Sequence, residues 1–156
     1  MLIKGEYMDK NYCWHNGDFT LTTDQSRFDL DDIFRYLTSS AWAKGIDKKT
    51  VAGSIESSLC FGLFYKDDQI GFARFVTDKF TFGYLCDVYV VDEWQGKKLG
   101  SWMIRCCHKH PSIMKLRRIL LVTSTAGWLY DKHNYTPVNE PDYIWQIFRP
   151  EIYNNE

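Results

Sequence analysis

Residues 87–110, DVYVVDEWQGKKLGSWMIRCCHKH, contain the change of periodicity that decides the fold. The residues that lead into and open this stretch, Leu85 to Val91, are rich in β-branched and aromatic side chains and predict a strand. From Leu99 onward the apolar residues recur at the spacing of one helix face. The stretch is therefore predicted to run from a strand through a polar turn into an amphipathic helix. The residues on the apolar face of that helix are Leu99, Trp102, Met103, Cys106 and Cys107.

The turn between the predicted strand and helix, Gln95 to Gly100, is a candidate site for a phosphate or pyrophosphate. The first turn of a helix has unpaired N–H groups and about half a unit of positive charge. Glycines let a ligand approach the backbone closely, and Lys97 and Lys98 add full positive charge. The alternative is an ordinary connection whose glycines serve only the turn. A dinucleotide fingerprint and a P-loop are excluded, because the glycine spacing fits neither.

Length and composition predict one domain over residues 1–156, because 156 residues with 45% hydrophobic content can bury a single core. The formal net charge of −1 and the lack of a basic run argue against a nucleic-acid partner. No apolar stretch approaches about 18 residues, so we expect no membrane association and a cytoplasmic location. The cysteines form no C-x-x-C pair, and His108 and His110 have no second ligand cluster, so no metal is expected.

The periodicity along the chain predicts the order β-α-α-β-β-β-α-β-α-β. An antiparallel front half followed by a β-α-β crossover gives an α/β (α+β) fold, with a mixed, mostly antiparallel sheet and helices on both faces. Asp29 or Asp31 is expected to cap the first helix and Asp47 the second, and Pro111 to end the central one. The expected strands are 19–23, 57–65, 69–77, 82–91, 116–123 and 143–148, and the last helix is 125–132.

With these elements in place, the stretch 91–100, VDEWQGKKLG, resembles the coenzyme-A loop of the GNAT family of N-acetyltransferases. The family pattern is a strand that ends in valine, followed by Q/R-x-x-G-x-G/A at the start of a helix. Gln95 and Gly100 match the ends of that pattern, and Lys98 stands where glycine is usual. This departure matters if the position needs a positive φ.

A second motif supports the resemblance. The stretch 125–138, TAGWLYDKHNYTPV, is similar to the family segment A-x-x-L-Y-x-x-x-G-F/Y. Asn134 replaces the glycine, and asparagine tolerates a left-handed conformation. The two motifs follow one another in the element order of the family, which the chain matches from Phe19 onward. The matching residues of the second motif are Ala126, Leu129, Tyr130 and Tyr135.

The resemblance implies that acetyl-CoA is the co-substrate, with its pantetheine arm on a strand backbone and its pyrophosphate at the helix start. It also implies that Tyr130 is the general acid, because a phenol can protonate a departing thiolate. The alternative for Tyr130 is a packed ring with its hydroxyl in water. The implied cofactor-binding residues are Tyr89, Val90, Val91, Gln95, Gly96, Lys97, Lys98, Leu99, Gly100 and Ser101.

Asp87 is the candidate general base, because a carboxylate among apolar neighbours needs a partner or a purpose. Strand alternation predicts that it shares a face with Tyr89 and Val91, opposite Cys86. It could accept an amine proton through water or hold a cationic substrate; the alternative is an ion pair with Arg74. By resemblance in placement, Trp42 and Arg74 line the acceptor pocket, although Trp42 could equally pack between two helices.

The sequence therefore predicts an acyltransferase that moves the acetyl group of acetyl-CoA to a primary amine of a small molecule or peptide. The amine attacks directly in a ternary complex, since no cysteine has the setting of a nucleophile. One alternative is a non-catalytic acyl-CoA-binding or regulatory module on the same fold. Another is an interaction domain with a vestigial cleft. The sequence is compatible with a homodimer and does not identify the acceptor.

Overall fold

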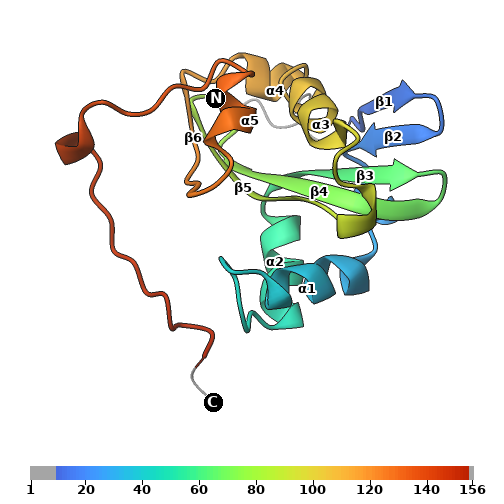
Figure 1. Cartoon of the computed structure of the whole chain (residues 1–156), viewed down its shortest axis with the longest axis horizontal. Helices are drawn as coiled ribbons and strands as arrows, with labels where there is room; N and C mark the ends of the chain where they lie inside the picture. Colours follow the sequence, from blue (N-terminus) through green and yellow to red (C-terminus); the bar gives the residue numbers. More distant parts are fainter. Residues whose placement is uncertain (1–9, 155–156) are drawn as a thin grey trace, which may run out of the picture.

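The computed structural model describes residues 10–154, which form a sheet of six strands flanked by helices (Figure 1). The strands lie in the sheet in their order along the chain, and every neighbouring pair is antiparallel except β5 and β6. The predicted fold class, a mixed and mostly antiparallel sheet with helices, is confirmed. The strands are β1 (Cys13–Asn16), β2 (Phe19–Thr22), β3 (Leu59–Tyr65), β4 (Asp68–Thr77), β5 (Phe82–Val90) and β6 (Arg118–Leu120).

The helices cover both faces of the sheet (Figure 1). One face carries α1 (Leu30–Ser39) and α2 (Lys48–Glu56), and the other carries α3 (Leu99–Cys107), α4 (Pro111–Met114) and α5 (Gly127–Asp131). Three short 3₁₀ turns complete the elements: η1 (Gln25–Arg27), η2 (Asp92–Trp94) and η3 (Pro141–Tyr143). Within residues 10–154 no helix has the length and apolar character needed to cross a membrane.

The first two helices start where the sequence predicts capping carboxylates. Asp29 accepts the backbone N–H of Asp32 at 3.0 Å, and Asp47 accepts that of Thr50 at 2.9 Å. Each bond satisfies one of the donors that a helix start leaves unpaired, which is worth about 1 kcal/mol. These caps fix the starts of α1 and α2 on one face of the sheet.

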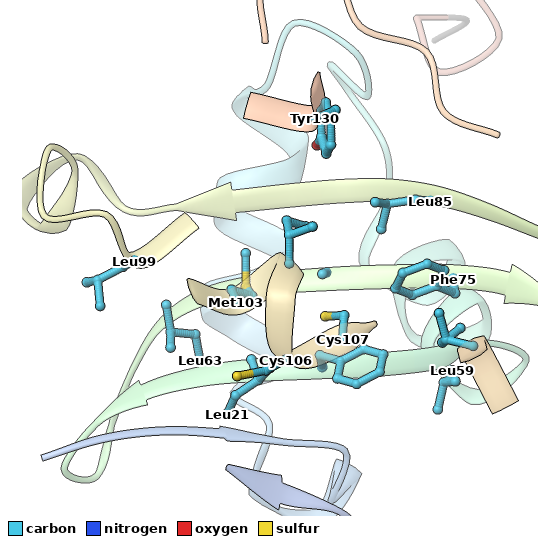
Figure 2. Close-up of a cluster of buried hydrophobic side chains, with 14 of the residues drawn as sticks. Leu21, Leu59, Leu63, Phe75, Leu85, Leu99, Met103, Cys106, Cys107 and Tyr130 are labelled. Atoms are coloured by element: carbon cyan, nitrogen blue, oxygen red, sulfur yellow. The ribbon is translucent and has the colours of Figure 1, made fainter. Parts of the chain in front are cut away.

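The hydrophobic core has two parts, one on each face of the sheet. The larger part packs α3 against the sheet (Figure 2), and the smaller packs α1 and α2 against the opposite face. Because both faces are covered, β3 is apolar almost throughout and buried from Leu59 to Phe64. Fully buried residues of the larger part include Leu21, Phe61, Leu63, Phe75, Met103 and Cys107.

The structure differs from the predicted order at four places, the first of which is an additional short strand, β1, before the predicted first strand. β6 is shorter than the predicted strand 116–123. The central helix α3 ends at Cys107, before Pro111, and that proline begins a short helix, α4, instead of ending α3 as predicted. The predicted final strand, 143–148, is not formed: in the described part of the chain it pairs with no other strand. Its apolar residues are exposed, with Trp145 89% accessible. The pattern of that segment indicated a need for burial and did not identify a partner.

Candidate active site

The sheet opens at its C-terminal edge, where β5 and β6 separate. The two strands pair only over Phe82–Tyr84 and Arg118–Leu120. From Leu85 to Val90, β5 therefore continues without a neighbouring strand on that side, among the residues that the structure describes. A row of backbone donors and acceptors is left at this open edge of β5.

Hydrogen bonding on the other side of β5 decides which groups face the open edge. The N–H of Val91 donates to the carbonyl of Ile70 at 2.8 Å, so Val91 faces β4. Because residues of an antiparallel strand alternate in the direction of their N–H groups, the N–H of Val90 faces the open edge. The side-chain amide Nε2 of Gln95 donates to the carbonyl of Val90 at 2.8 Å, and this bond links the turn to the end of β5.

A β-bulge interrupts β5 at Asp87. The pairing register with β4 shifts between Phe72 and Arg74, and Asp87 has a φ of +53°. Because of the bulge, the prediction that Cys86 lies on the face opposite Asp87 is wrong. Cys86 pairs with Arg74, the ion-pair partner of Asp87, so Cys86 and Asp87 lie on the same face of the sheet. One extra residue resets the alternation, and neither composition nor periodicity indicates where it is inserted.

Asp87 forms the ion pair that the sequence left open as an alternative. Arg74 Nε lies 2.8 Å from Asp87 Oδ2, and the two side chains are only 17% and 10% exposed. The indole N–H of Trp42 donates to Asp87 Oδ1 at 3.1 Å, and Arg74 Nη1 donates to Ser58 Oγ at 3.1 Å. The predicted acceptor residues Trp42 and Arg74 therefore meet at Asp87. Trp42 is 54% exposed and is not a core residue between the helices.

The loop before α3 has the conformation that a glycine would favour at Lys98. Lys98 has a φ of +62° and Gly96 a φ of +79°, so the usual glycine of the family pattern corresponds to a left-handed position that lysine occupies here. A methyl group added at Gly96 would meet nothing within 4 Å, and at Gly100 it would meet only Leu129 Cδ2 at 4.0 Å. The start of α3 is therefore open to a ligand.

The side chains of two predicted cofactor residues belong to the core. Leu99 is 5% exposed, and the ring of Tyr89 stacks on Tyr36 of α1 with centroids 3.8 Å apart. Only the backbone of Leu99 and Tyr89 is left to contact a ligand. Two cavities, of about 550 and 620 Å³, are lined by other parts of the surface. The candidate site is thus defined by an open strand edge and a helix start.

Tyr130 lies beside β5 on the side away from β4 (Figure 2). It is 8% exposed, and burial raises the pKa of its phenol to about 12. Its ring contacts Tyr135 edge-on, with centroids 5.6 Å apart, and the hydroxyl of Tyr135 shares a hydrogen bond of 2.9 Å with His108 Nε2. Within residues 10–154 the Tyr130 hydroxyl makes no hydrogen bond, so it differs from the anchored hydroxyl of Tyr135.

His133 is a residue of this region that the sequence reasoning missed. Its Nε2 shares a hydrogen bond of 2.9 Å with the hydroxyl of Ser101, which joins the first turn of α3 to the segment after α5. Burial lowers the pKa of His133, which favours the neutral ring at pH 7. The available signal was its place inside the second motif, next to Asn134, whose φ of +67° agrees with the left-handed turn predicted there.

Comparison with known proteins assigns the chain to a family. The sequence profile of the acetyltransferase (GNAT) domain matches residues 56–137. A protein of Gibberella zeae that carries an acetyltransferase name, FG08082, is 31% identical and is matched over 77% of this chain and 80% of its own length. The chain therefore belongs to the GNAT acetyltransferase family.

Solved structures agree with this assignment. A crystal structure from Xanthomonas campestris pv. campestris, of a protein placed in the GNAT family, is 36% identical with a TM-score of 0.85, over 88% of this chain and 97% of that one. A GNAT family acetyltransferase from Elizabethkingia anophelis, solved with acetyl-CoA bound, has a TM-score of 0.61 over 84% of this chain and 90% of that one. At 13% identity the latter shows a shared fold only.

The left-handed conformation at Lys98 predicts an unusual response to glycine. A non-glycine residue in the left-handed conformation costs about 1–2 kcal/mol of backbone strain. Lys98→Gly removes this strain but adds the entropic cost of glycine, so the free energy of unfolding should rise by about 0.5 kcal/mol. Lys97, whose φ is not positive, is the matched control, and Lys97→Gly should lower stability. Urea denaturation of the unliganded protein measures both. Equal losses in the two variants would contradict the assignment of strain to Lys98.

Proposed function

We propose that the protein is an N-acetyltransferase that moves the acetyl group of acetyl-CoA to a primary amine of a small molecule or peptide. The observation that carries the proposal is the open edge of β5, which leads into the start of α3 and has Tyr130 beside it. The family membership supports the transfer reaction, and the acetyl-CoA in the Elizabethkingia anophelis structure supports the donor. The amine attacks the thioester directly while both substrates are bound.

The open edge and the helix start suit the two ends of the donor. The N–H of Val90 would polarise the thioester carbonyl as negative charge develops on its oxygen. The first turn of α3, with Lys97, Lys98 and the hydroxyl of Ser101, would hold the pyrophosphate. The empty space above Gly96 and Gly100 supports this fit, because a phosphate must approach the backbone closely there.

Tyr130 would give its proton to the thiolate as the C–S bond breaks. Because burial raises its pKa to about 12, the phenol stays protonated at neutral pH. A thiolate whose conjugate acid has a pKa near 8.5 is a weaker base than this phenolate, so full proton transfer is uphill, and the hydroxyl would act through a hydrogen bond to the sulfur that strengthens as negative charge develops in the transition state. A hydroxyl without a protein partner fits both this role and a packed ring with its hydroxyl in water, and the second test below separates the two.

Asp87 has two roles open to it in this reaction. As a general base it would take the amine proton, directly or through water. As a positioning residue it would fix Arg74 and Trp42 around the acceptor. Its contacts with both side chains support positioning, since each carboxylate oxygen already has a donor. The base role stays a prediction, and one variant separates the two.

The first test concerns donor binding. Gly100→Glu adds a side chain and a negative charge where the pyrophosphate is expected, so coenzyme-A binding should be lost while the fold is kept. Gly53→Glu is the matched control, because Gly53 is an exposed helical glycine of α2 with nothing within 4 Å of an added methyl. Isothermal titration calorimetry measures both. Wild-type affinity in a folded Gly100→Glu protein would place the donor elsewhere.

The second test concerns the acid. Tyr130→Phe keeps the ring and removes the proton, so the rate should fall by about 10²-fold with coenzyme-A affinity unchanged. Tyr135→Phe is the control, because it removes the hydroxyl that bonds His108 and should cost stability without comparable loss of rate. Single-turnover kinetics, in which chemistry is observed directly, decide. If the rate of Tyr130→Phe equals that of the wild type, Tyr130 packs and does not donate. If the wild-type protein acetylates no amine, a non-catalytic acyl-CoA-binding module becomes the better proposal.

The third test concerns Asp87. If it is the base, Asp87→Asn loses most turnover at pH 7 and recovers part of it at high pH, where free amine accumulates. If it positions Arg74, the pH–rate profile runs parallel to wild type and stability falls by about 3 kcal/mol, because the guanidinium loses its buried partner. Glu93→Gln, an exposed change on the next turn of the chain, should alter neither quantity.

A further inference from the structure

The C-terminal part of the chain, residues 136–154, forms an arm that leaves the sheet and its helices (Figure 1). The arm contains the largest group of exposed apolar residues in the described chain. Tyr143 is 81% exposed, Trp145 89%, Ile147 81% and Phe148 72%. Soluble proteins rarely leave so large an apolar surface contiguous unless another surface covers it.

The exchange segment, residues 144–148 of this arm, has the sequence character of a strand that is covered on both faces. In an extended chain Trp145 and Ile147 lie on one face, and Ile144 and Phe148 lie on the other. Only Gln146 is polar. Prolines occur at 141 and 150 and not between, so every backbone N–H of the segment is available for a ladder. Insertion at a sheet edge would satisfy these groups and bury both faces.

The chain also offers an unpaired edge. The sheet ends at β6, which pairs with β5 on one side and, within residues 10–154, with no strand on the other. An exposed edge of this kind is a template for a further strand. Val122, two residues beyond β6, is 83% exposed, so apolar surface continues next to this edge. The same molecule thus carries an unpaired strand and an unpaired edge.

The position of the arm favours a second copy of the chain over its own edge as the partner. The far end of the arm returns to the loop between α1 and α2, where the carbonyl of Tyr153 would lie 2.9 Å from a methyl group added at Gly45. The exchange segment is therefore held between two attachments to its own body, in an extended form, and it does not lie on its own β6.

The area available is enough for a stable pair. An aromatic side chain buries about 150–250 Å² when it is packed, so the two exposed rings of the exchange segment, Trp145 and Phe148, supply about 400 Å². Two arms supply about 800 Å², and the partner surface that they cover brings the total above the roughly 1,200 Å² of a standard specific interface. Reciprocal exchange is closed by a two-fold axis, so no further copies would be added.

We propose that the exchange segment is a shared strand: in a symmetric dimer it pairs with the free edge of β6 of a second copy of this chain. Each copy gives one segment and receives one. The sheet of each copy thereby gains the strand that its own chain does not supply. The dimer is a property of the arm and of β6, and it does not depend on the acetyl-transfer chemistry.

The test measures the oligomeric state of the whole chain. Light scattering coupled to size exclusion should give a dimer at micromolar concentration. Ile147→Asp places a charge in the buried face of the shared strand and should raise the dimer dissociation constant by roughly 100-fold or more. Asn139→Asp adds the same charge to an exposed position of the arm outside the segment and should leave the dimer intact. A monomeric wild-type protein, or a dimer that Ile147→Asp does not weaken, overturns the proposal.

A second measurement needs no variant and covers the case in which Ile147→Asp does not fold. Hydrogen exchange of the wild-type protein is followed at several concentrations. Amides of residues 144–148 and of β6 should become protected together as the concentration rises. Protection in a protein that light scattering shows to be monomeric identifies docking on the same chain, and absence of protection identifies an uncovered arm. Either result overturns the exchange.

Discussion

The bulge at Asp87 is the constraint on which the arrangement of the site depends. A positive φ at a side-chain-bearing residue costs about 1–3 kcal/mol, and here it is held by a buried ion pair with Arg74 and a hydrogen bond from Trp42. One inserted residue turns β5 so that it pairs with β6 over only three residues and then runs alone. The same contacts tie the loop between α1 and α2 to the sheet. The strain, the opening of the sheet and the position of the loop between α1 and α2 are therefore parts of a single local structure.

That opening explains why groups from distant parts of the sequence act in one place. Backbone groups at the end of β5 have no ladder partner, and the turn that follows them starts a helix. Gln95 closes the turn by bonding the carbonyl of Val90, which brings the start of α3 next to the open edge. Tyr130, from α5, lies on the same side, and the hydrogen bond between Ser101 and His133 fixes α3 relative to the segment that follows it. The open strand edge, the start of α3 and Tyr130 are thus positioned by contacts among three elements.

How much of this could be predicted follows from the range of each interaction. The change from strand to helix at residues 85–107 and the caps at Asp29 and Asp47 are local patterns, and the structure has them. The coenzyme-A loop and Tyr130 were predicted by resemblance, and Lys98 has the conformation that the usual glycine implies. The bulge was not predictable, because it depends on the register of two strands. His133 was missed because its partner, Ser101, is distant in sequence. Strand 143–148 was predicted from a pattern that records apolar character and carries no information about what the segment pairs with.

The agreement between strand order in the sheet and order in the sequence has a consequence for biosynthesis. Each strand from β2 to β6 leaves the ribosome when the strand it pairs with is already available, so loop closure is inexpensive and the body can fold as it is made. The arm follows the body. A newly made chain therefore passes through a stage in which its core is complete and its exposed apolar surface is concentrated in the arm. This separation restricts the species prone to aggregation to a folded one, which is a safer intermediate than an unfolded chain with the same exposed residues.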